Sequence, residues 1–172
     1  MRQLFAFIDA TNTLDELLNE TMKTQGVADV PLGVFLSGGL DSALIASIMQ
    51  SQSDVPIDTF TMGYENTDYD ESAQARKYSK YLGTNHTEMI VTSEDALSVI
   101  PGLGNIFDEP FADASQIPTL LVSSLAKTKV KVALSGDGAD EMFGGYNRYF
   151  FGESMYRYMK FAPVSVRRII SF

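Results

Sequence analysis

The sequence predicts an α/β fold in which a parallel, twisted sheet carries helices on both faces. Short apolar runs typical of buried strands alternate with longer amphipathic runs typical of helices. The connections between successive strands are long enough to hold a crossover helix, which makes neighbouring strands parallel. A glycine-rich segment, residues 37–42, stands between the first strand and the helix after it, and open α/β sheets bind their ligands at such loops.

Each element has its own signal, beginning with a helix ahead of the first strand. Thr13 and Glu16 form a capping-box pattern followed by apolar residues at helical spacing, so we expect the helix to begin there. Four apolar runs are expected to be strands: 32–36, 57–62, 87–91 and 130–134. The segments between them are expected to be helices: 42–50, 70–82, 93–100 and 115–127.

The composition is that of one globular domain of 172 residues, 45% of them hydrophobic. The absence of cysteine excludes disulfides, thiolate metal sites and a cysteine nucleophile. No apolar run reaches the roughly 20 residues that span a bilayer, so we expect no membrane partner and a cytoplasmic location. Residues 1–141 hold 8 basic and 21 acidic side chains, which argues against a nucleic-acid partner.

The segment 37–42, Ser-Gly-Gly-Leu-Asp-Ser, is typical of an anion-binding loop. Gly38 and Gly39 let the backbone bring bare N–H groups to a phosphate, and the following helix contributes partial positive charge. The hydroxyls of Ser37 and Ser42 add donors. An aspartate would repel a phosphate unless it holds a cation, so Asp41 predicts a Mg²⁺ ion shared with the phosphates of a nucleotide. The sequence has no Walker motif, which disfavours a Walker-type kinase or GTPase.

A second loop of similar character, Ser135 to Glu141, follows the last expected strand. Ligands of open α/β sheets bind beyond the carboxyl ends of the strands, so we expect the two loops to converge there. Asp137, Asp140 and Glu141 lie within five positions, a density of negative charge that a cation would offset. We predict Asp41 and Asp140 as Mg²⁺ ligands, whereas Glu141 is explained equally well as an acid favoured at a helix N-terminus.

The segment 37–42 resembles the pyrophosphatase loop (PP-loop) of the ATP pyrophosphatases, enzymes that split ATP between its α- and β-phosphates. Three further segments resemble the synthetase domain of glutamine-hydrolysing asparagine synthetases: 108–113 (Asp-Glu-Pro-Phe-Ala-Asp), 115–118 (Ser-Gln-Ile-Pro) and 134–146, which begins Leu-Ser-Gly-Asp-Gly. The resemblance spans Val30 to Tyr149 and implies the adenine nucleotide alpha hydrolase-like fold of the ATP pyrophosphatases.

This resemblance implies an ATP-dependent carbon–nitrogen ligase. A carboxylate, aspartate in the type case, attacks the α-phosphorus of ATP, pyrophosphate leaves, and ammonia then converts the acyl-adenylate to asparagine. ATP and Mg²⁺ are the implied cofactors, and the protein's task is electrostatic. No covalent enzyme intermediate is required, so His86, the single histidine, is expected to have a structural or surface role.

Loop chemistry and resemblance together assign the candidate residues. The nucleotide-binding set is Phe35, Ser37, Gly38, Gly39, Asp41, Ser42, Met62, Ser135 and Gly136. The catalytic set is Asp41, Asp137 and Asp140, and the substrate set is Asp113, Ser115, Gln116 and Asp137. Two of these residues have plain alternatives, because Met62 can fill a gap in the core and Ser115 can cap the following helix.

Two departures from the family leave other functions open. Asp137 stands where asparagine synthetases usually have glutamate, so a ligase for another carboxylate, such as a sugar acid, stays open. The additional lysine and acid that the family has beyond this region are absent after Phe172, so a non-catalytic nucleotide-binding remnant stays open as well. We expect 1–150 to form the PP-loop domain, with 1–30 a leading helical segment, and 151–172 to begin a truncated helical part.

The same comparison predicts partners. The family's glutaminase domain, with its N-terminal cysteine, is missing here, so a separate glutaminase domain or subunit is a possible source of ammonia. Six aromatic residues between Tyr149 and Phe161 would normally pack on the absent part, which predicts self-association.

Overall fold

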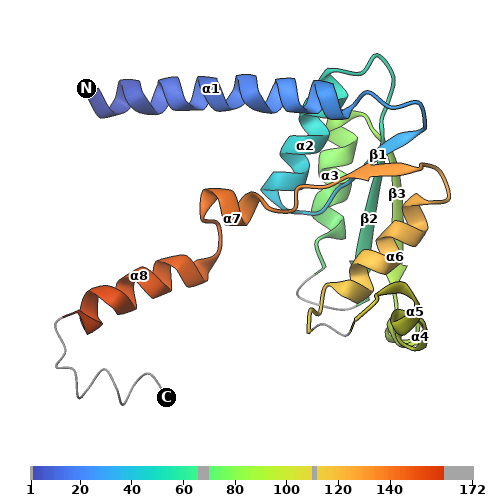
Figure 1. Ribbon diagram of the computed structural model, residues 1–172. Coiled ribbons are helices and arrows are strands. Elements are labelled where there is room, and N and C mark those ends of the chain that lie inside the picture. The colour runs from blue at the N-terminus through green and yellow to red at the C-terminus, as the bar shows by residue number, and fades with distance from the viewer. Residues whose placement is uncertain (1, 66–69, 110–111, 161–172) are drawn as a thin grey trace. The chain divides into compact units, whose positions relative to one another are not determined.

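The computed structural model describes residues 2–65, 70–109 and 112–160. They fall into two compact units, Met1–Gly136 and Asp137–Phe172, and each unit is described by itself. The strands are β1 (Leu32–Phe35), β2 (Asp58–Tyr64), β3 (Asn85–Val91) and β4 (Val132–Leu134) (Figure 1). The helices of the first unit are α1 (Arg2–Gln25), α2 (Leu40–Ser51), α3 (Ser72–Leu82), α4 (Ser93–Val99), α5 (Leu103–Ile106) and α6 (Gln116–Ala126).

The strands pair in parallel in the order β3-β2-β1-β4, which confirms the predicted parallel α/β sheet (Figure 1). The chain adds β2 and then β3 on one side of β1, and it returns to place β4 on the other side. The carboxyl ends of β1 and β4 therefore flank the point where the strand order reverses. Open α/β sheets bind their ligands at this point.

Helices cover both faces of the sheet, as predicted. On one face α2, α3 and the C-terminal end of α1 enclose a core that includes Val34 and Leu36. On the other face α6 packs over Phe60, which is fully buried. Gly33 of β1 makes room for this ring, because a Cβ there would lie 2.7 Å from Cε2 of Phe60. The sheet thus lies between two apolar layers.

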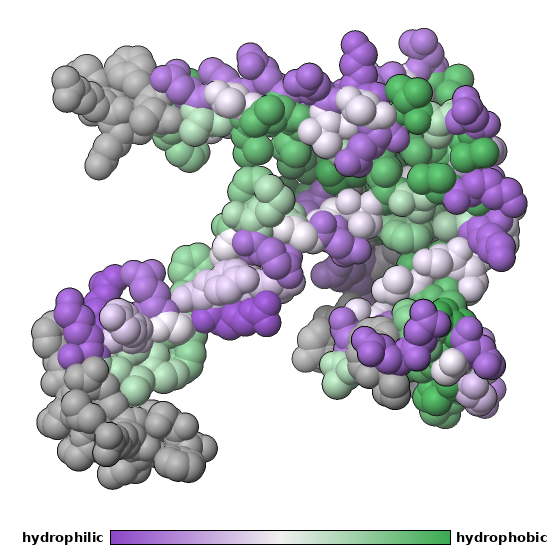
Figure 2. Space-filling view, in the orientation of Figure 1, coloured by the Kyte–Doolittle hydropathy of each residue, from purple (hydrophilic) through white to green (hydrophobic). Residues whose placement is uncertain are grey.

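Helix α1 begins earlier than the sequence predicts. Thr13 lies inside the helix, where its hydroxyl donates to the Asp9 carbonyl at 2.8 Å instead of capping a helix start. The capping-box interpretation of Thr13 is therefore wrong, although the helix itself is confirmed. Leu18 and Met22 join the core, and Leu17 is 56% exposed. Figure 2 shows hydrophilic residues along one side of α1 and hydrophobic residues along the other.

The other predicted strands and helices are confirmed to within two residues at each end. A capping box that the sequence analysis did not identify starts α4, where the Thr92 hydroxyl accepts from the Asp95 N–H at 3.1 Å and the Asp95 carboxylate accepts from the Thr92 N–H at 2.9 Å. Beyond α4, Pro101 lies in a 3-10 turn, Ile100–Gly102, that leads into α5.

The described residues of the second unit include the helices α7 (Ala139–Phe143) and α8 (Asn147–Met159). The Tyr146 hydroxyl donates to Oε1 of Glu141 at 2.7 Å, and this bond raises the pKa of Tyr146 to about 12. The Arg148 guanidinium lies 4.2 Å from the Tyr146 ring centroid. The exposed aromatic residues of α8 are Tyr149, Phe150, Phe151, Tyr156 and Tyr158, while Phe161 lies outside the described residues. Within the described part of the chain, no helix combines the length and apolar character needed to cross a membrane.

Candidate nucleotide-binding site

Two serines hold the loop between β1 and α2 in shape. Ser42 is buried, and its Oγ accepts from the Ser37 backbone N–H at 3.0 Å and lies 2.9 Å from the Ser37 Oγ. The Ser37 Oγ in turn accepts from the Gly39 N–H at 3.0 Å. Ser42 therefore supports the loop from inside, whereas Ser37 is exposed. The two hydroxyls, which look equivalent in the sequence, have different positions in the fold.

The sequence analysis expected the backbone N–H groups of the loop to be bare, but several of them have acceptors within the protein. Acceptors inside the protein satisfy the N–H groups of Ser37 and Gly39, and the Gly38 N–H donates to Oε2 of Glu71 at 3.1 Å. The open donors belong to the first turn of α2, because the first N–H groups of a helix lack intrahelical partners and Gly39 offers no side-chain cap. An anion at this loop would be held chiefly by the N-terminus of α2.

The loop after β4 meets the first loop at Gly136. An ideal Cβ on Gly136 would lie 2.9 Å from the Ser42 backbone nitrogen and 3.0 Å from the Asp41 carbonyl carbon. The two backbones therefore touch, with no room for a side chain between them. The pairing of Val34 with Leu134 brings the ends of β1 and β4 side by side and so directs Ser135 and Gly136 to this place. The expected convergence of the two loops is found in the structure.

Asp41 lies half-buried in the first turn of α2. Among the residues that the structure describes, its carboxylate has no hydrogen-bond or ion-pair partner. Those residues also include no group of three or more acidic, histidine or cysteine side chains that could hold a metal. Mg²⁺ is commonly bound by one or two carboxylates together with waters and substrate phosphates, so Asp41 fits such an ion. Asp137 and Asp140 belong to the second unit, and their role at this loop stays a prediction.

Phe35 and Met62 share one face of the sheet. Phe35 pairs in register with Phe60 and packs against the core under α6. Alternation along β2 places Met62 on the same face as Phe60, and Met62 is half-buried. Phe35 therefore has a packing role, and a contact of either residue with a nucleotide stays a prediction.

Asp113, Ser115 and Gln116 form the turn that starts α6. The Asp113 carboxylate accepts from the Ser115 N–H at 2.8 Å, and the Gln116 amide donates to the Asp113 carbonyl at 2.9 Å. Hydrogen bonding from Ser115 holds the pKa of Asp113 below its usual value. Ser115 occupies the N-cap position without a side-chain cap bond. Because α6 leads into a parallel strand, its start lies at the carboxyl edge of the sheet, the edge that carries the Ser37 loop.

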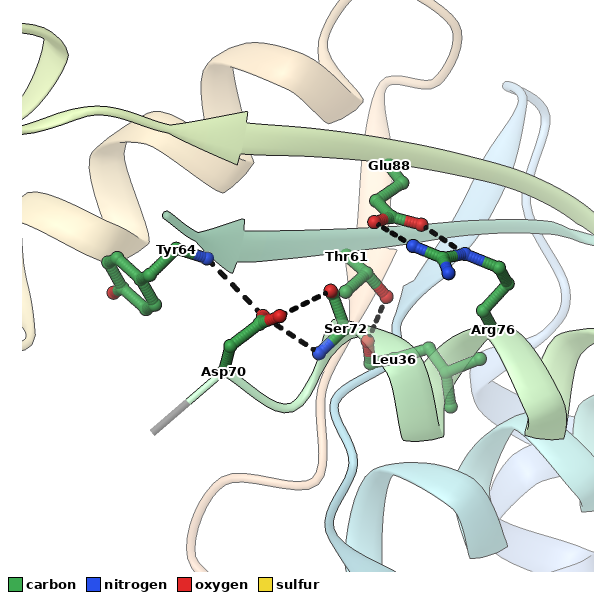
Figure 3. A network of polar contacts seen from close by, with 7 residues as sticks. All are labelled: Leu36, Thr61, Tyr64, Asp70, Ser72, Arg76 and Glu88. Carbon is green, nitrogen blue, oxygen red and sulfur yellow. Dashed lines mark hydrogen bonds and ion pairs between the residues drawn. The ribbon is translucent and has the colours of Figure 1, made fainter. Parts of the chain in front are cut away.

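The sequence analysis missed Glu71, which accepts from the Gly38 N–H of the loop, and Asp70, which anchors the start of α3 next to Glu71. Asp70 accepts from the Ser72 N–H at 3.1 Å, the Ser72 hydroxyl at 3.0 Å and the Tyr64 N–H at 3.3 Å (Figure 3). These bonds, chiefly those from Ser72, lower the pKa of Asp70. The signal that could have found them is the polar run Asp-Glu-Ser just before an amphipathic helix, a typical helix start.

His86 belongs to a polar chain inside the first unit. Its Nδ1 lies 3.0 Å from the Thr59 hydroxyl, which is 2.8 Å from the Thr84 hydroxyl. Burial lowers the pKa of His86. The surroundings of this imidazole are those of a structural residue in β3.

Comparison with known proteins matches this geometry to a family. The asparagine synthase family model matches residues 13–168. The chain belongs to the asparagine synthase family. A relative of the family in Methanocaldococcus jannaschii is 40% identical over 141 residues, which are 81% of this chain and 27% of the relative. The glutamine-hydrolyzing asparagine synthetase 1 of Bacillus subtilis is 40% identical over 122 residues, 71% of this chain and 19% of that protein. The chain thus spans about a quarter of these relatives or less.

Solved structures show the same fold at low identity. The NH3-dependent NAD synthetase of Campylobacter jejuni superposes with a TM-score of 0.54 at 15% identity, covering 79% of this chain and 60% of the synthetase. The NMN synthetase of Francisella tularensis gives a TM-score of 0.53 at 16% identity, covering 77% of this chain and 56% of that one. This chain, as a member of the asparagine synthase family, therefore has the adenine nucleotide alpha hydrolase-like fold that the sequence predicted.

Proposed function

We propose that this chain is the nucleotide-binding part of an ATP-dependent amide-forming ligase. In the proposed reaction the carboxylate of aspartate attacks the α-phosphorus of ATP and pyrophosphate leaves. Ammonia then displaces AMP from the aspartyl-adenylate to form asparagine. Membership of the asparagine synthase family supports this chemistry, and we propose a glutaminase domain or subunit as the ammonia source, because the relatives are named glutamine-hydrolyzing and this chain has no cysteine.

The observation that carries the proposal is the contact of the two loops at the reversal of strand order. Gly136 touches the backbone of Asp41 and Ser42, so the start of α2 and the loop after β4 border one place at the carboxyl edge. That place combines a helix N-terminus with an exposed hydroxyl, Ser37, which is the donor set a polyphosphate requires.

In this proposal the loop residues bind and orient the polyphosphate. The first-turn N–H groups of α2 and the Ser37 hydroxyl donate to phosphate oxygens, while Ser42 keeps the loop in shape. These donors are in place before the reaction, so they stabilise the charge that gathers on the departing pyrophosphate without first reorganising. Asp41 and Asp140 would hold Mg²⁺, which when bound supplies further charge neutralisation.

Fewer observations bear on the site for the carboxylate substrate. The hydrogen bonds from Ser115 hold the pKa of Asp113 below its usual value, and this side chain lies at the start of α6, on the same edge of the sheet as the Ser37 loop. We propose Asp113, Ser115, Gln116 and Asp137 for the acceptor. A second candidate function, amidation of another carboxylate such as a sugar acid, stays open because Asp137 is shorter by one methylene than the glutamate usual in asparagine synthetases.

Titration calorimetry with ATP, with and without Mg²⁺, tests the nucleotide site. We expect binding that requires Mg²⁺ and is lost in Asp41→Asn. Asp54→Asn is the matched control, because it makes the same charge change at an exposed position before β2, at the opposite edge of the sheet. Loss of binding in both variants, or in neither, would contradict the role of Asp41. If the chain is folded but binds no ATP at millimolar concentration, the proposed function is wrong.

The identity of the acceptor carboxylate is tested by measuring AMP release in the presence of ammonia. Aspartate and sugar acids are compared in one series, and the protein used is extended to the length of its relatives. Release with aspartate alone supports asparagine formation, and release with another acid supports the second candidate. Binding of Mg²⁺ and ATP without AMP release from any acid would favour a non-catalytic nucleotide-binding module.

A further inference from the structure

An acidic side chain accepts a hydrogen bond from a backbone N–H of the loop at residues 37–42. The Gly38 N–H donates to Oε2 of Glu71 at 3.1 Å, although the two residues lie 33 positions apart in the sequence. Glu71 stands at the N-cap of α3, and its side chain is exposed. A carboxylate oxygen on this N–H takes the place that the oxygen of a bound phosphate could take.

The contact is built into the packing of the loop. An ideal Cβ on Gly38 would lie 2.8 Å from Cβ of Glu71, 3.1 Å from its carbonyl oxygen and 3.2 Å from Cβ of Gln74. The loop backbone therefore lies directly against the first turn of α3, and this close approach explains why a glycine stands at position 38. The packing of the loop on α3 therefore places the Glu71 carboxylate beside the Gly38 amide.

The turn that carries Glu71 is itself anchored. Asp70 binds the backbone and hydroxyl of Ser72 and the backbone of Tyr64, which ties the start of α3 to the end of β2 (Figure 3). Gly63 adds to this anchorage, since a Cβ there would meet Cβ of Ser72 at 2.8 Å. The backbone of Glu71 is thereby held while its exposed carboxylate keeps the freedom to rotate away.

We propose that the Glu71 carboxylate occupies the position of a phosphate group at the Gly38 N–H, an inference that rests on the proposed nucleotide site. This carboxylate holds the Gly38 N–H while the loop is empty, and the polyphosphate of the nucleotide displaces it. Because both groups are anions and use the same donor, Glu71 competes with the ligand. The device keeps the loop in its binding shape and lowers its affinity for polyphosphates in general, so that weakly held anions do not occupy it.

The test compares wild type with Glu71→Gln and Glu71→Ala, using inorganic pyrophosphate and Mg²⁺ with ATP as probes in calorimetry. An exposed charged hydrogen bond contributes up to about 1 kcal/mol, so we expect Kd to fall by about threefold to fivefold in both variants. Glu94→Gln is the matched control, since it removes the same charge from the first turn of α4. Its Kd should equal that of wild type.

A second readout does not depend on ligand binding. In ¹⁵N-labelled protein the Gly38 amide resonance should shift upfield in Glu71→Gln and Glu71→Ala and stay in place in Glu94→Gln. An unmoved Gly38 resonance overturns the proposal at its first step. If wild type binds the probes and the Glu71 variants bind them equally or more weakly, the competition is wrong while the nucleotide site stands. If none of the proteins binds either probe, the nucleotide site and the proposal fail together.

Discussion

Replacement of Gly136 by alanine tests the contact between the two loops directly. The added methyl group would lie 2.9 Å from the Ser42 nitrogen, 3.0 Å from the Asp41 carbonyl carbon and 3.1 Å from the Asp41 Cβ. Atoms in ordinary van der Waals contact are about 3.5–4.0 Å apart, so one loop must move by at least about half an ångström. Two of the three contacts are to backbone atoms, so no side-chain rotation relieves them.

Overpacking of this kind costs about 1–3 kcal/mol, and the edge of the sheet can yield more easily than a core. We expect Gly136→Ala to lose about 1–2 kcal/mol in the free energy of unfolding by urea, followed by circular dichroism. We also expect about tenfold weaker binding of Mg²⁺ with ATP, because the displaced loop carries the first turn of α2 away from its donor geometry.

Gly104→Ala is the control for adding a methyl group. Gly104 is exposed in α5, and no heavy atom lies within 4 Å of its ideal Cβ. An alanine inside a helix is more favourable than glycine, so we expect equal or slightly higher stability and unchanged nucleotide affinity. The reasoning is refuted if Gly136→Ala behaves like Gly104→Ala in both assays, since the two loops would then not be in contact.

Three further changes test the surroundings of the site. Ser42→Ala removes the buried acceptor of the Ser37 N–H, so we expect a loss of about 1–3 kcal/mol in urea titration, and an unchanged midpoint would contradict the supporting role of this hydroxyl. The lowered pKa of Asp70 means that its carboxylate stabilises the fold above the pKa of the unfolded chain and that this stability is lost as the pH falls through the folded-state pKa. Asp70→Asn should therefore flatten the acid side of the stability–pH curve, whereas parallel curves for the two proteins would speak against the hydrogen bonds to Ser72 and Tyr64. Glu141→Gln should bring the pKa of Tyr146 down from about 12 toward 10.0 in a ¹³C-tyrosine NMR titration, and a midpoint that does not move would exclude the Glu141 bond as the cause.

Local signals were enough to predict the strands, most helices and the position of the glycine-rich loop between β1 and α2. The glycine pair, the acid and the apolar run before Ser37 are contiguous, and parallel topology follows from the strand–helix alternation alone. The same topology predicted the edge at which the loops after β1 and β4 meet. Thr13 shows the limit of local reasoning, because a threonine that caps a helix and one that bonds back to the preceding turn look alike in sequence.

The internal structure of the site depends on contacts that no local pattern records. Ser37 and Ser42 carry the same hydroxyl, and burial alone makes one a support and leaves the other exposed. The glycine at position 38 suggested room for a phosphate, yet its neighbour is the first turn of α3. The bond to Glu71 joins segments, 33 residues apart in the sequence, that the pairing of β1 with β2 brings together.

The pairing of the first strand with the last also orders the events of folding. Leu32 pairs with Val132, a separation of 100 residues, while the helices and neighbouring strands between them form shorter contacts. Closing so long a loop costs chain entropy, and β4 can reach β1 only after the chain through Leu134 has left the ribosome. Because Gly136 arrives with β4, a nascent chain stopped ahead of this strand can hold the first loop but lacks its counterpart. If the proposed function holds, the nucleotide site would therefore be complete only after β4 has joined the sheet.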